Sequence, residues 1–374
     1  MALNLRSPII LNTAVPNTAY ATLDISVWDG DGSATVTAQY NLRKNNTGVF
    51  LNFEISELVR DYLDISFDGN YNGQAVWVKF VHKVFNASNV EIFSSVGVQV
   101  AFDGYYYFEE AQTATPSLLI SNRELFVLED NTFRIPINTL GNPTVVFYKD
   151  GKVIASETIG SSTLSSGQIK YVSIYGDSVN WDTFQERVLD ANGDYEPNAC
   201  LQSFFDNYSI GAVDKITVSD SSGIQTIKVN VIEECKYEPK KVTFINKFGA
   251  LQDMYFFKKS KENLTIKKES YKSNIALNYG GYNSTTHVNR DFNVIGNESI
   301  SLSSGYLSEE YNEVFKQLLL SEKVWVTNIL ESGEQVLPIN VKTSSIAYKT
   351  SVNDKLVDYT IEFDKSFDTI NNIR

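Results

Sequence analysis

Histidine and cysteine are the residues that this sequence lacks most clearly. Its 374 residues include two histidines, His82 and His287, and two cysteines, Cys200 and Cys235. A hydrolytic triad, a histidine-ligated metal centre or a histidine general base would have to use one of these two histidines. Two cysteines cannot complete a zinc site by themselves, and we expect buried thiols rather than a disulfide. The scarcity predicts a protein that is not an enzyme and binds no metal or cofactor.

Long apolar runs are also missing. No segment approaches 18 consecutive apolar residues, and the start, MALNLRSPIILNTAVPN, is interrupted by Arg6, Pro8 and Pro16. This pattern predicts neither a membrane span nor a secretory signal. Hydrophobic residues nevertheless make up 43% of the chain and aromatic residues 13%, which is enough to build packed cores. At this length we expect two or three domains.

Motifs for metal, phosphate or sugar chemistry are weak throughout. WDGDGS, residues 28–33, resembles part of a calcium loop, but it lacks the later ligands and the terminal glutamate, so a turn is the simpler interpretation. YGGY, residues 279–282, has no helix pattern after it, which argues against a phosphate site. GYYYFEE, residues 104–110, either offers three tyrosines to a sugar or alternates them along a strand. Adjacent acidic residues, such as Glu109 and Glu110 at the end of this segment, do not by themselves indicate the pair of catalytic carboxylates of a glycosidase.

Charge is distributed unevenly along the chain. The formal net charge is −13, yet residues 236–290 carry 11 basic and 4 acidic residues, whereas residues 1–235 carry 14 and 28. An acidic body repels phosphate backbones, so we expect no direct nucleic-acid binding. In FFKKSKENLTIKKESYKSN, lysines flank Asn263, and we predict a basic hairpin that turns there. This hairpin either protects a sheet edge or meets an acidic partner subunit. Its candidate interaction residues are Lys258, Lys259, Lys261, Lys267, Lys268 and Lys272.

Strand patterns dominate the rest of the sequence. Short β-branched and aromatic runs, such as QAVWVKFVHKVF and NVEIFSSVGVQVAF, are separated by turn residues. KDGK predicts a tight hairpin because Asp-Gly supplies the positive φ that the turn requires, and its surroundings are typical of an Ig-like sandwich. FEISELVRDYL allows two helical turns. We predict a mainly β fold of several sandwiches: an N-terminal β-sandwich-like domain at 1–112, an Ig-like domain at 113–236 and a C-terminal β-sandwich with one packed helix at 237–374.

That helix is the clearest helical prediction in the chain, at residues 308–321. Ser308 can act as an N-cap, and glutamates follow where they favour the positive end of the helix dipole. Apolar residues then recur on a period of 3.6 residues. The next residues, KVWVTN, are typical of a strand, so we expect the helix to lie on a sheet and close one side of a sandwich. The apolar stripe consists of Tyr311, Val314, Phe315, Leu318 and Leu319.

Two parts of the chain resemble virion structural proteins of tailed bacteriophages, the class encoded among tail and baseplate genes. The first part is LNLRSPIIL…TLDISVWDGDG…YNLRKNNTGVFLNFEISELVRDYL. The second contains FINKFGALQDMYFF, GYLSEEYNEVFKQLLLSEKVWVTN and VLPINVKTSSIAYKTSVNDKLVDYTIEF. The resemblance covers the first and third domains. It implies a sheet-plus-helix domain of the tail-tube or distal-tail kind, repeated around a ring, with the Ig-like block turned outward.

The resemblance therefore implies a structural component of a phage tail or baseplate. Such a protein would form a ring with copies of itself and connect neighbouring tail proteins. It would be located in the virion tail after assembly in the host cytoplasm. The alternative is a receptor- or carbohydrate-binding tail module that uses the tyrosines of the first domain as an aromatic groove. A glycan-cleaving tail component is a third hypothesis.

Overall fold

A computed structural model of the chain confirms the predicted mainly β fold with a packed helix. Cys200, Cys235 and most of WDGDGS lie outside the residues that the structure describes. In the described part of the chain, no helix is long and apolar enough to cross a membrane. The described residues are 2–29, 36–48, 50–71, 75–110, 115–128, 132–139, 141–159, 169–175, 179–180, 213–232, 234, 236–274, 280–281, 283–330, 333–347 and 356–370.

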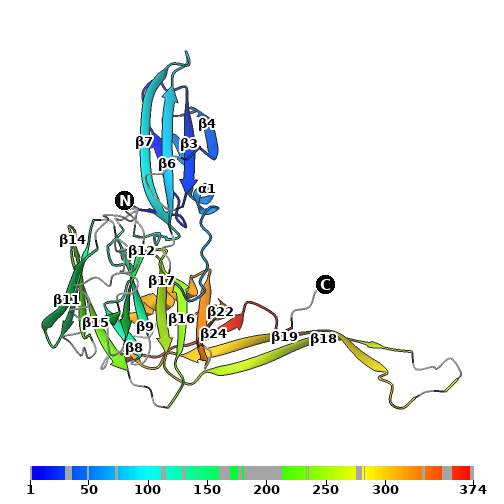
Figure 1. Cartoon of the computed structure of the whole chain (residues 1–374). Helices are drawn as coiled ribbons and strands as arrows, with labels where there is room; N and C mark the ends of the chain where they lie inside the picture. The colour runs from blue at the N-terminus through cyan, green and yellow to red at the C-terminus, as the bar shows by residue number, and fades with distance from the viewer. Residues whose placement is uncertain are drawn as a thin grey trace, which may run out of the picture.

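The described residues of 2–60 and 76–103 form a tower that projects from the rest of the molecule (Figure 1). Residues 61–71 run down along the C-terminal sheet, where the Tyr71 hydroxyl donates to Asp253. Its main sheet has the strand order β1-β7-β6-β3-β4. A second pair, β2 (Ile10–Thr13) and β5 (Leu51–Glu54), and helix α1 (Ser56–Arg60) contribute to the same hydrophobic core. Alternation along β6 buries every second side chain in this core. The strands of the main sheet are β1 (Leu3–Asn4), β3 (Tyr20–Trp28), β4 (Tyr40–Asn45), β6 (Val76–Phe85) and β7 (Glu91–Phe102).

The middle of the chain forms two sheets, with strand orders β11-β10-β14-β15-β8 and β13-β12-β9. The KDGK turn joins β10 to β11, and the positive φ predicted for it is confirmed, at 49° for Asp150 and 74° for Gly151. The first and last strands, β8 and β15, pair in parallel. The strands are β8 (Glu124–Leu128), β9 (Thr132–Asn138), β10 (Thr144–Lys149), β11 (Lys152–Thr158), β12 (Ile169–Tyr175), β13 (Val179–Asn180), β14 (Lys215–Asp220) and β15 (Gly223–Ile232).

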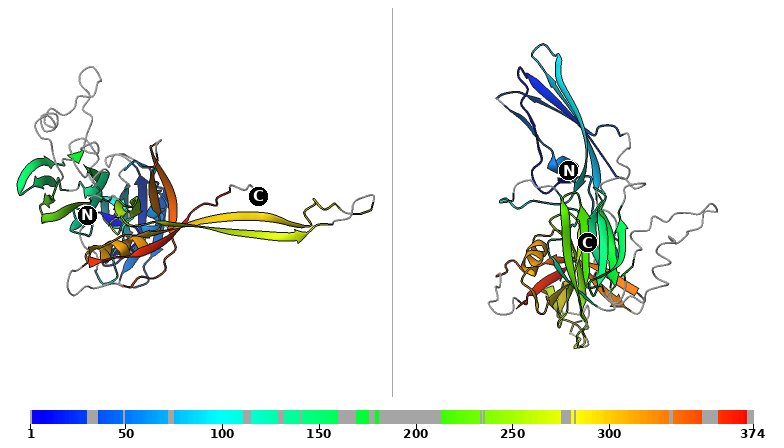
Figure 2. Two further views of the ribbon diagram at one scale, coloured as in Figure 1. Left: turned by 90° about the horizontal axis from the view of Figure 1, so that it is seen from below. Right: turned by 90° about the vertical axis from the view of Figure 1, so that its left-hand side faces the viewer.

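The C-terminal part is built on a seven-stranded sheet of order β17-β16-β21-β22-β24-β19-β18. Two of its strands, β18 and β19, continue far beyond the sheet (Figure 1; Figure 2, left). A short pair, β20 (Leu307–Ser308) and β23 (Leu356–Val357), precedes and follows the helix. The sheet strands are β16 (Lys240–Ile245), β17 (Leu251–Phe256), β18 (Lys261–Lys272), β19 (Asn289–Ser303), β21 (Val324–Leu330), β22 (Gly333–Val341) and β24 (Thr360–Lys365).

The predicted helix is present as α3, but it is shorter than expected and spans Tyr311–Leu319. Ser308 does not cap it, because Ser308 belongs to β20 and pairs with Leu356 of β23. The apolar stripe is buried as predicted except for Leu319, which is half-buried. The ring of Phe315 lies 4.7 Å from that of Tyr359, centroid to centroid. The helix therefore closes the core through the residues that its period indicated.

Gln317 is a buried helix residue that the apolar pattern did not predict. Its side chain is fully buried. The Gln317 amide donates to Ser121 Oγ at 2.7 Å and to Glu313 Oε1 at 2.8 Å. Its Oε1 accepts from the backbone N–H of Lys247 at 3.3 Å. The helix is thus held against the middle and C-terminal parts by polar contacts as well as by its apolar face.

The core does not stop at the predicted boundary near residue 236. One cluster of buried side chains runs from Leu118 through Phe147 and Phe244 to Phe363, so the middle and C-terminal sheets share it. We call these two parts, without the projecting portion of β18 and β19, the body. A second cluster joins Trp77 of the tower to body residues such as Leu251 and Trp325.

Candidate functional site

The lysine-rich candidate segment lies on a long two-stranded ribbon (Figure 1). β18 is the edge of the seven-stranded sheet and pairs with β19 from Lys261 opposite Ser301 to Lys272 opposite Asn289. β24 pairs with β19 only from Ser299 to Ser303, so the rest of the ribbon has no third strand among the described residues. We call residues 261–272 and 289–298 the arm.

The predicted turn at Asn263 is wrong. Asn263 lies inside the continuous strand β18, opposite Ser299 of β19, and the connection of the hairpin runs between Lys272 and Asn289. The physical reason is that no second turn residue stands beside Asn263, whereas the alternating residues around it suit a strand. The lysines therefore lie along one strand of the arm instead of on both sides of a turn.

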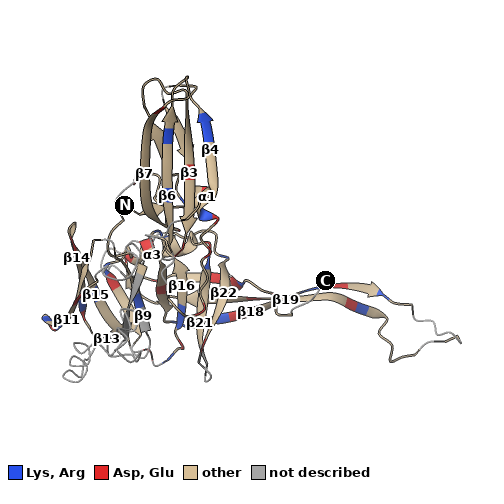
Figure 3. Ribbon diagram, turned by 45° about the horizontal axis from the view of Figure 1, so that its top comes forward, with Lys and Arg blue, Asp and Glu red and all other residues tan. Residues whose placement is uncertain are grey.

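Pairing with β19 also changes the charge of this predicted basic element (Figure 3). The partner strand brings acidic residues beside the lysines, and Lys268 Nζ lies 2.6 Å from Asp291 Oδ2. Hydrogen bonds from Lys268 and Ser270 lower the pKa of Asp291. The arm as a whole is nearly neutral. Its basic residues are Lys261, Lys267, Lys268, Lys272 and Arg290, and its acidic residues are Glu262, Glu269, Asp291 and Glu298.

The six candidate lysines do not form one site. Lys258 precedes the arm and belongs to the body, where its Nζ lies 2.9 Å from Glu234 Oε2. Its aliphatic chain covers Gly305, because a Cβ on that glycine would lie 3.0 Å from Lys258 Cε. Lys259 is exposed at the base of the arm. The other four lysines are spread along β18.

Exposed apolar side chains distinguish the arm, and the sequence reasoning missed them. Every residue of β18 is exposed, including Leu264 at 55% and Ile266 at 59%. On the distal part, the rings of Tyr271 and Phe292 meet edge to face at 5.6 Å, and both remain more than 40% exposed. The alternation of Leu264 and Ile266 with polar residues was a signal for an apolar face within the lysine-rich segment.

The base of the arm is tied to the last described residues of the chain. Thr369 N–H donates to the carbonyl of Gly296 at 2.8 Å, and Asn297 Nδ2 donates to Asp368 Oδ1 at 2.6 Å. The Glu298 carboxylate accepts from Lys365, and this contact lowers the pKa of Glu298. These contacts hold the direction of the arm where it leaves the sheet.

The second candidate, GYYYFEE, is not a strand as predicted. Tyr105, Tyr106 and Tyr107 lie in the connection between the tower and the body, and all three are half-buried. Tyr105 N–H donates to the carbonyl of Lys247 at 2.8 Å, and Tyr106 N–H donates to Ser7 Oγ at 2.8 Å. These bonds to separate elements replace the ladder that a strand would need.

Tyr107 ties this connection to helix α3. Its hydroxyl donates to Glu313 Oε1 at 2.8 Å, and Lys316 Nζ lies 3.5 Å from the centroid of its ring. Burial raises the pKa of Tyr107, and the nearby Tyr105 and Glu313 raise it further. The tyrosine therefore stays protonated and acts as a hydrogen-bond donor at the junction.

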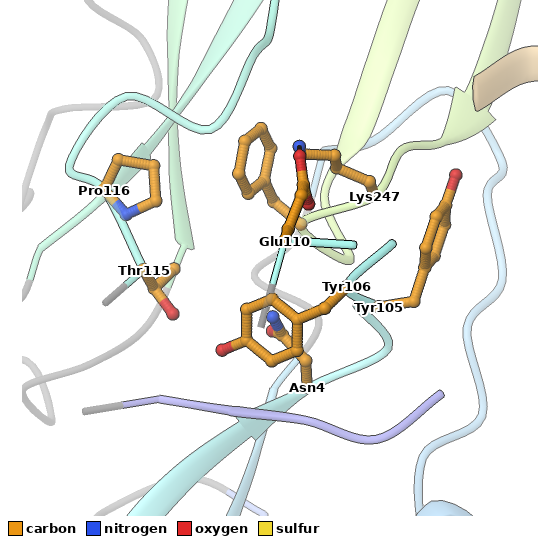
Figure 4. A pocket seen from close by; sticks show the side chains of 8 residues that line it. Asn4, Tyr105, Tyr106, Glu110, Thr115, Pro116 and Lys247 are labelled. Carbon is orange, nitrogen blue, oxygen red and sulfur yellow. Dashed lines mark hydrogen bonds and ion pairs between the residues drawn. The ribbon is translucent and has the colours of Figure 1, made fainter. Parts of the chain in front are cut away.

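A pocket of about 210 Å³ opens beside the same connection (Figure 4). Lys247 Nζ lies 2.8 Å from Glu110 Oε1, so these two charged residues of the pocket lining neutralise each other. Asn4 is 3% exposed, and its Oδ1 has no hydrogen-bond partner among the described residues. The pocket offers aromatic faces and buried unpaired oxygens, Asn4 Oδ1 among them, to a small polar molecule. It is lined by Asn4, Tyr105, Tyr106, Glu110, Thr115, Pro116, Lys247 and Phe248.

Two glycines bring the connection and the body into backbone contact. Gly249 has φ 77°, and a Cβ there would lie 2.7 Å from the backbone nitrogens of Asp103 and Gly104. A Cβ on Gly104 would lie 2.9 Å from the backbone carbonyl oxygen of Lys247. Arg60 reinforces the junction, because its Nε lies 2.9 Å from Asp103 Oδ1 and its Nη2 lies 2.5 Å from Glu322 Oε2. The tower is thus fixed to the body by several independent contacts.

The two histidines lie in different surroundings. His82 is buried in β6, where its Nε2 lies 2.8 Å from Thr13 Oγ1 and burial lowers its pKa. His287 is exposed. The described residues include no group of three or more His, Cys, Asp or Glu side chains that could hold a metal ion.

Comparison with known proteins does not assign this geometry to a family. No protein-family model, no curated protein and no solved structure matched the chain.

Proposed function

We propose that this protein is a structural component of a phage tail or baseplate, and that its arm joins it to neighbouring copies in a ring. The observation that carries the proposal is the arm itself, whose strand β18 is exposed at all twelve residues. The phage location follows from the sequence resemblance alone. The proposal assigns no catalytic step to the chain.

The apolar side chains of the arm give the physical reason for assembly. A two-stranded ribbon is only marginally stable in water unless a further surface covers it. The arm extends away from the tower and the body (Figure 2), so no other described segment covers its distal residues and a partner molecule can do so. Burying a large apolar side chain contributes up to about 1.5–3 kcal/mol. Leu264, Ile266 and Phe292 retain exposed area for such a contact.

The lysines then orient the encounter and add little affinity. The arm is nearly neutral as a whole, but Lys261, Lys267 and Lys272 are exposed on it, and the complete chain has a net charge of −13. Charges of this kind mainly steer association and set its salt dependence. In this proposal the acidic surface of an adjacent copy or of another virion protein receives these lysines.

The proposal is tested by separating the apolar and charged contributions of the arm. We expect a Leu264→Ser/Ile266→Ser variant to fold normally and to be lost from particles when it replaces the wild-type protein during infection. A Lys267→Glu/Lys272→Glu variant should incorporate more slowly, with the difference shrinking as salt rises. The matched control is Ile224→Ser, since Ile224 is 73% exposed but lies on β15 in the body. Normal incorporation of the apolar arm variant, with its folding unchanged, would refute the role of the arm.

A second candidate function rests on the pocket beside Tyr106. Its aromatic lining and the unpaired Oδ1 of Asn4 suit a carbohydrate unit, because sugars stack on aromatic faces and fill polar positions with hydroxyl groups. A glycan array compared between wild type and Tyr106→Ala tests this candidate. Binding that disappears in Tyr106→Ala would favour a receptor-binding module, whereas no binding by wild type would remove this candidate.

A further inference from the structure

The outer edge of β7 in the tower is open along most of its length. On that side β7 pairs only with the two-residue strand β1, at Ala101 and Phe102. From Phe93 to Val100 no other described strand lies beside it, and β7 forms one side of the tower (Figure 1). An unpaired strand edge presents backbone donors and acceptors that can pair with another strand.

The direction of the outward backbone groups follows from one hydrogen bond. Leu5 N–H donates to the carbonyl of Phe102 at 2.9 Å, so the Phe102 backbone faces the open edge. In an antiparallel sheet this direction alternates with a period of two. The N–H and C=O groups of Val98, Val96 and Ser94 therefore point outward as well, with no change of register until the bulge at Ile92.

This edge lacks the features that normally prevent strand addition. Edge strands are usually protected by lysine, proline or bulges. Residues 93–100 of β7, FSSVGVQV, contain no charge and no proline. Val96 is 62% exposed, Val98 is 45% exposed and Phe93 is 42% exposed. The edge of β18, by contrast, carries four lysines.

We infer that β7 is a self-association surface, on which β7 of a second copy of this chain adds in antiparallel orientation, centred on Ser95. In this register Ser94 lies opposite Val96, and both have outward backbone groups. Phe93 lies opposite Gly97, where an aromatic ring can cover the glycine across the strands. Two-fold pairing places the same residues of the two copies close together. A charged strand would therefore be repelled by its own copy, whereas the neutral β7 segment is not.

The surroundings of β7 leave room for this pairing. A Cβ built on Gly97 would meet only Phe80 Cδ2, at 4.0 Å, so space remains above the glycine for the partner's ring. The paired segment ends before Ala101, where β1 begins to cover the edge. Joining the two five-stranded sheets would form one continuous sheet across the dimer.

Matched substitutions on two edge strands test the inference in the full-length protein. Wild type should sediment with twice the chain mass of 42.0 kDa at high concentration, and Val96→Lys should reduce the mass to that of one chain. Val153→Lys is the control, because Val153 is 58% exposed on β11, the edge of another sheet. A monomeric wild-type protein, a dimer that survives Val96→Lys, or equal loss in Val153→Lys would each overturn the inference.

A cysteine at the two-fold centre tests the register. Opposed residues in a non-hydrogen-bonded antiparallel pair have Cα atoms about 4.5 Å apart, which permits a disulfide. In a Cys200→Ser/Cys235→Ser background, Ser95→Cys should cross-link two chains under mild oxidation, whereas Ser156→Cys on β11 should not. A dimer without this cross-link would overturn the proposed pairing. The inference does not rest on the arm, so Leu264→Ser/Ile266→Ser should leave the dimer unchanged.

Discussion

The tower and the arm project from the same body but are stabilised in different ways. The tower buries its own cluster of apolar side chains, including Leu23, Ile25 and Val78, each with no exposed surface. The arm buries nothing along β18, and its contacts with other described segments lie at its base. The tower also makes ion pairs with Glu322 of the body, through Arg6 and Arg60, and close backbone contacts at Gly249.

The difference shows what a projection needs in order to be ordered. A projection either has enough apolar side chains to form its own core, or it must bury its apolar side chains against a partner molecule. In the tower, the second layer formed by β2, β5 and α1 provides that core. In the arm, no second layer is present among the described residues. Order in the arm is therefore expected to depend on assembly much more than order in the tower.

The largest expected effect comes from placing the same substitution in both projections. Leu23→Asp buries an unpaired carboxylate in the tower core, which costs several kcal/mol and is enough to unfold a marginally stable unit. Leu264→Asp, on the exposed arm, should change the free energy of unfolding of the monomer by less than about 0.5 kcal/mol. Chemical unfolding followed by circular dichroism measures both. Equal losses would show that the arm already packs against something in the monomer.

A smaller effect is expected at the junction below the tower. Arg60→Ala leaves the Asp103 carboxylate without its ion-pair partner at 2.9 Å, which should cost about 1–3 kcal/mol. Burial already raises the pKa of Asp103, and Arg60 counteracts this rise. Without Arg60 the pKa of Asp103 rises further.

The pH dependence of that variant follows from the direction of the shift. A carboxyl whose folded pKa is raised destabilises the fold above that pKa, and the cost disappears as pH falls toward the unfolded pKa. The difference in Tm between wild type and Arg60→Ala should therefore be largest at neutral pH and shrink in acid. A constant difference across this range would show that Asp103 is not the group responsible.

The smallest effect is expected from an ion pair on the arm itself. Lys268→Ala removes the contact with Asp291, but both side chains are more than 40% exposed. Exposed pairs of this kind contribute little to the free energy of unfolding, because water and salt screen the two charges. The Tm of Lys268→Ala in thermal unfolding should therefore match that of wild type within about 1 °C. A clear loss of stability would mean that the arm contributes to the folded monomer through its charges.

Local patterns in the sequence predicted the elements well where neighbours along the chain decide the structure. The buried stripe of α3 follows from its 3.6-residue period, and the β10–β11 turn follows from the conformational freedom of Asp150 and Gly151. The predicted boundaries of the helix were less accurate, because Ser308 pairs in a strand with Leu356, which lies far along the chain.

The candidate site was predicted only in part. The lysines marked the segment that becomes the arm, but their charge is offset by β19, whose pairing the local sequence does not specify. The tyrosines of GYYYFEE became part of a junction because Tyr105 and Tyr106 bond to Lys247 and Ser7, which are distant in sequence. The apolar face of the arm was present in the alternation of Leu264 and Ile266, but it was hidden among charges.

The sequence by itself determined the mainly β character, the packed helix and the absence of a histidine-rich or cysteine-rich site, because composition and short periods act locally. Only the tertiary structure decided that Phe93 to Val100 form an open edge, that Lys261 to Lys272 leave the sheet on an exposed ribbon, and that Gly249 meets Asp103. Which strands pair, and which edges remain open, depends on contacts between residues far apart in the chain, and these contacts are set by the packing of the whole core.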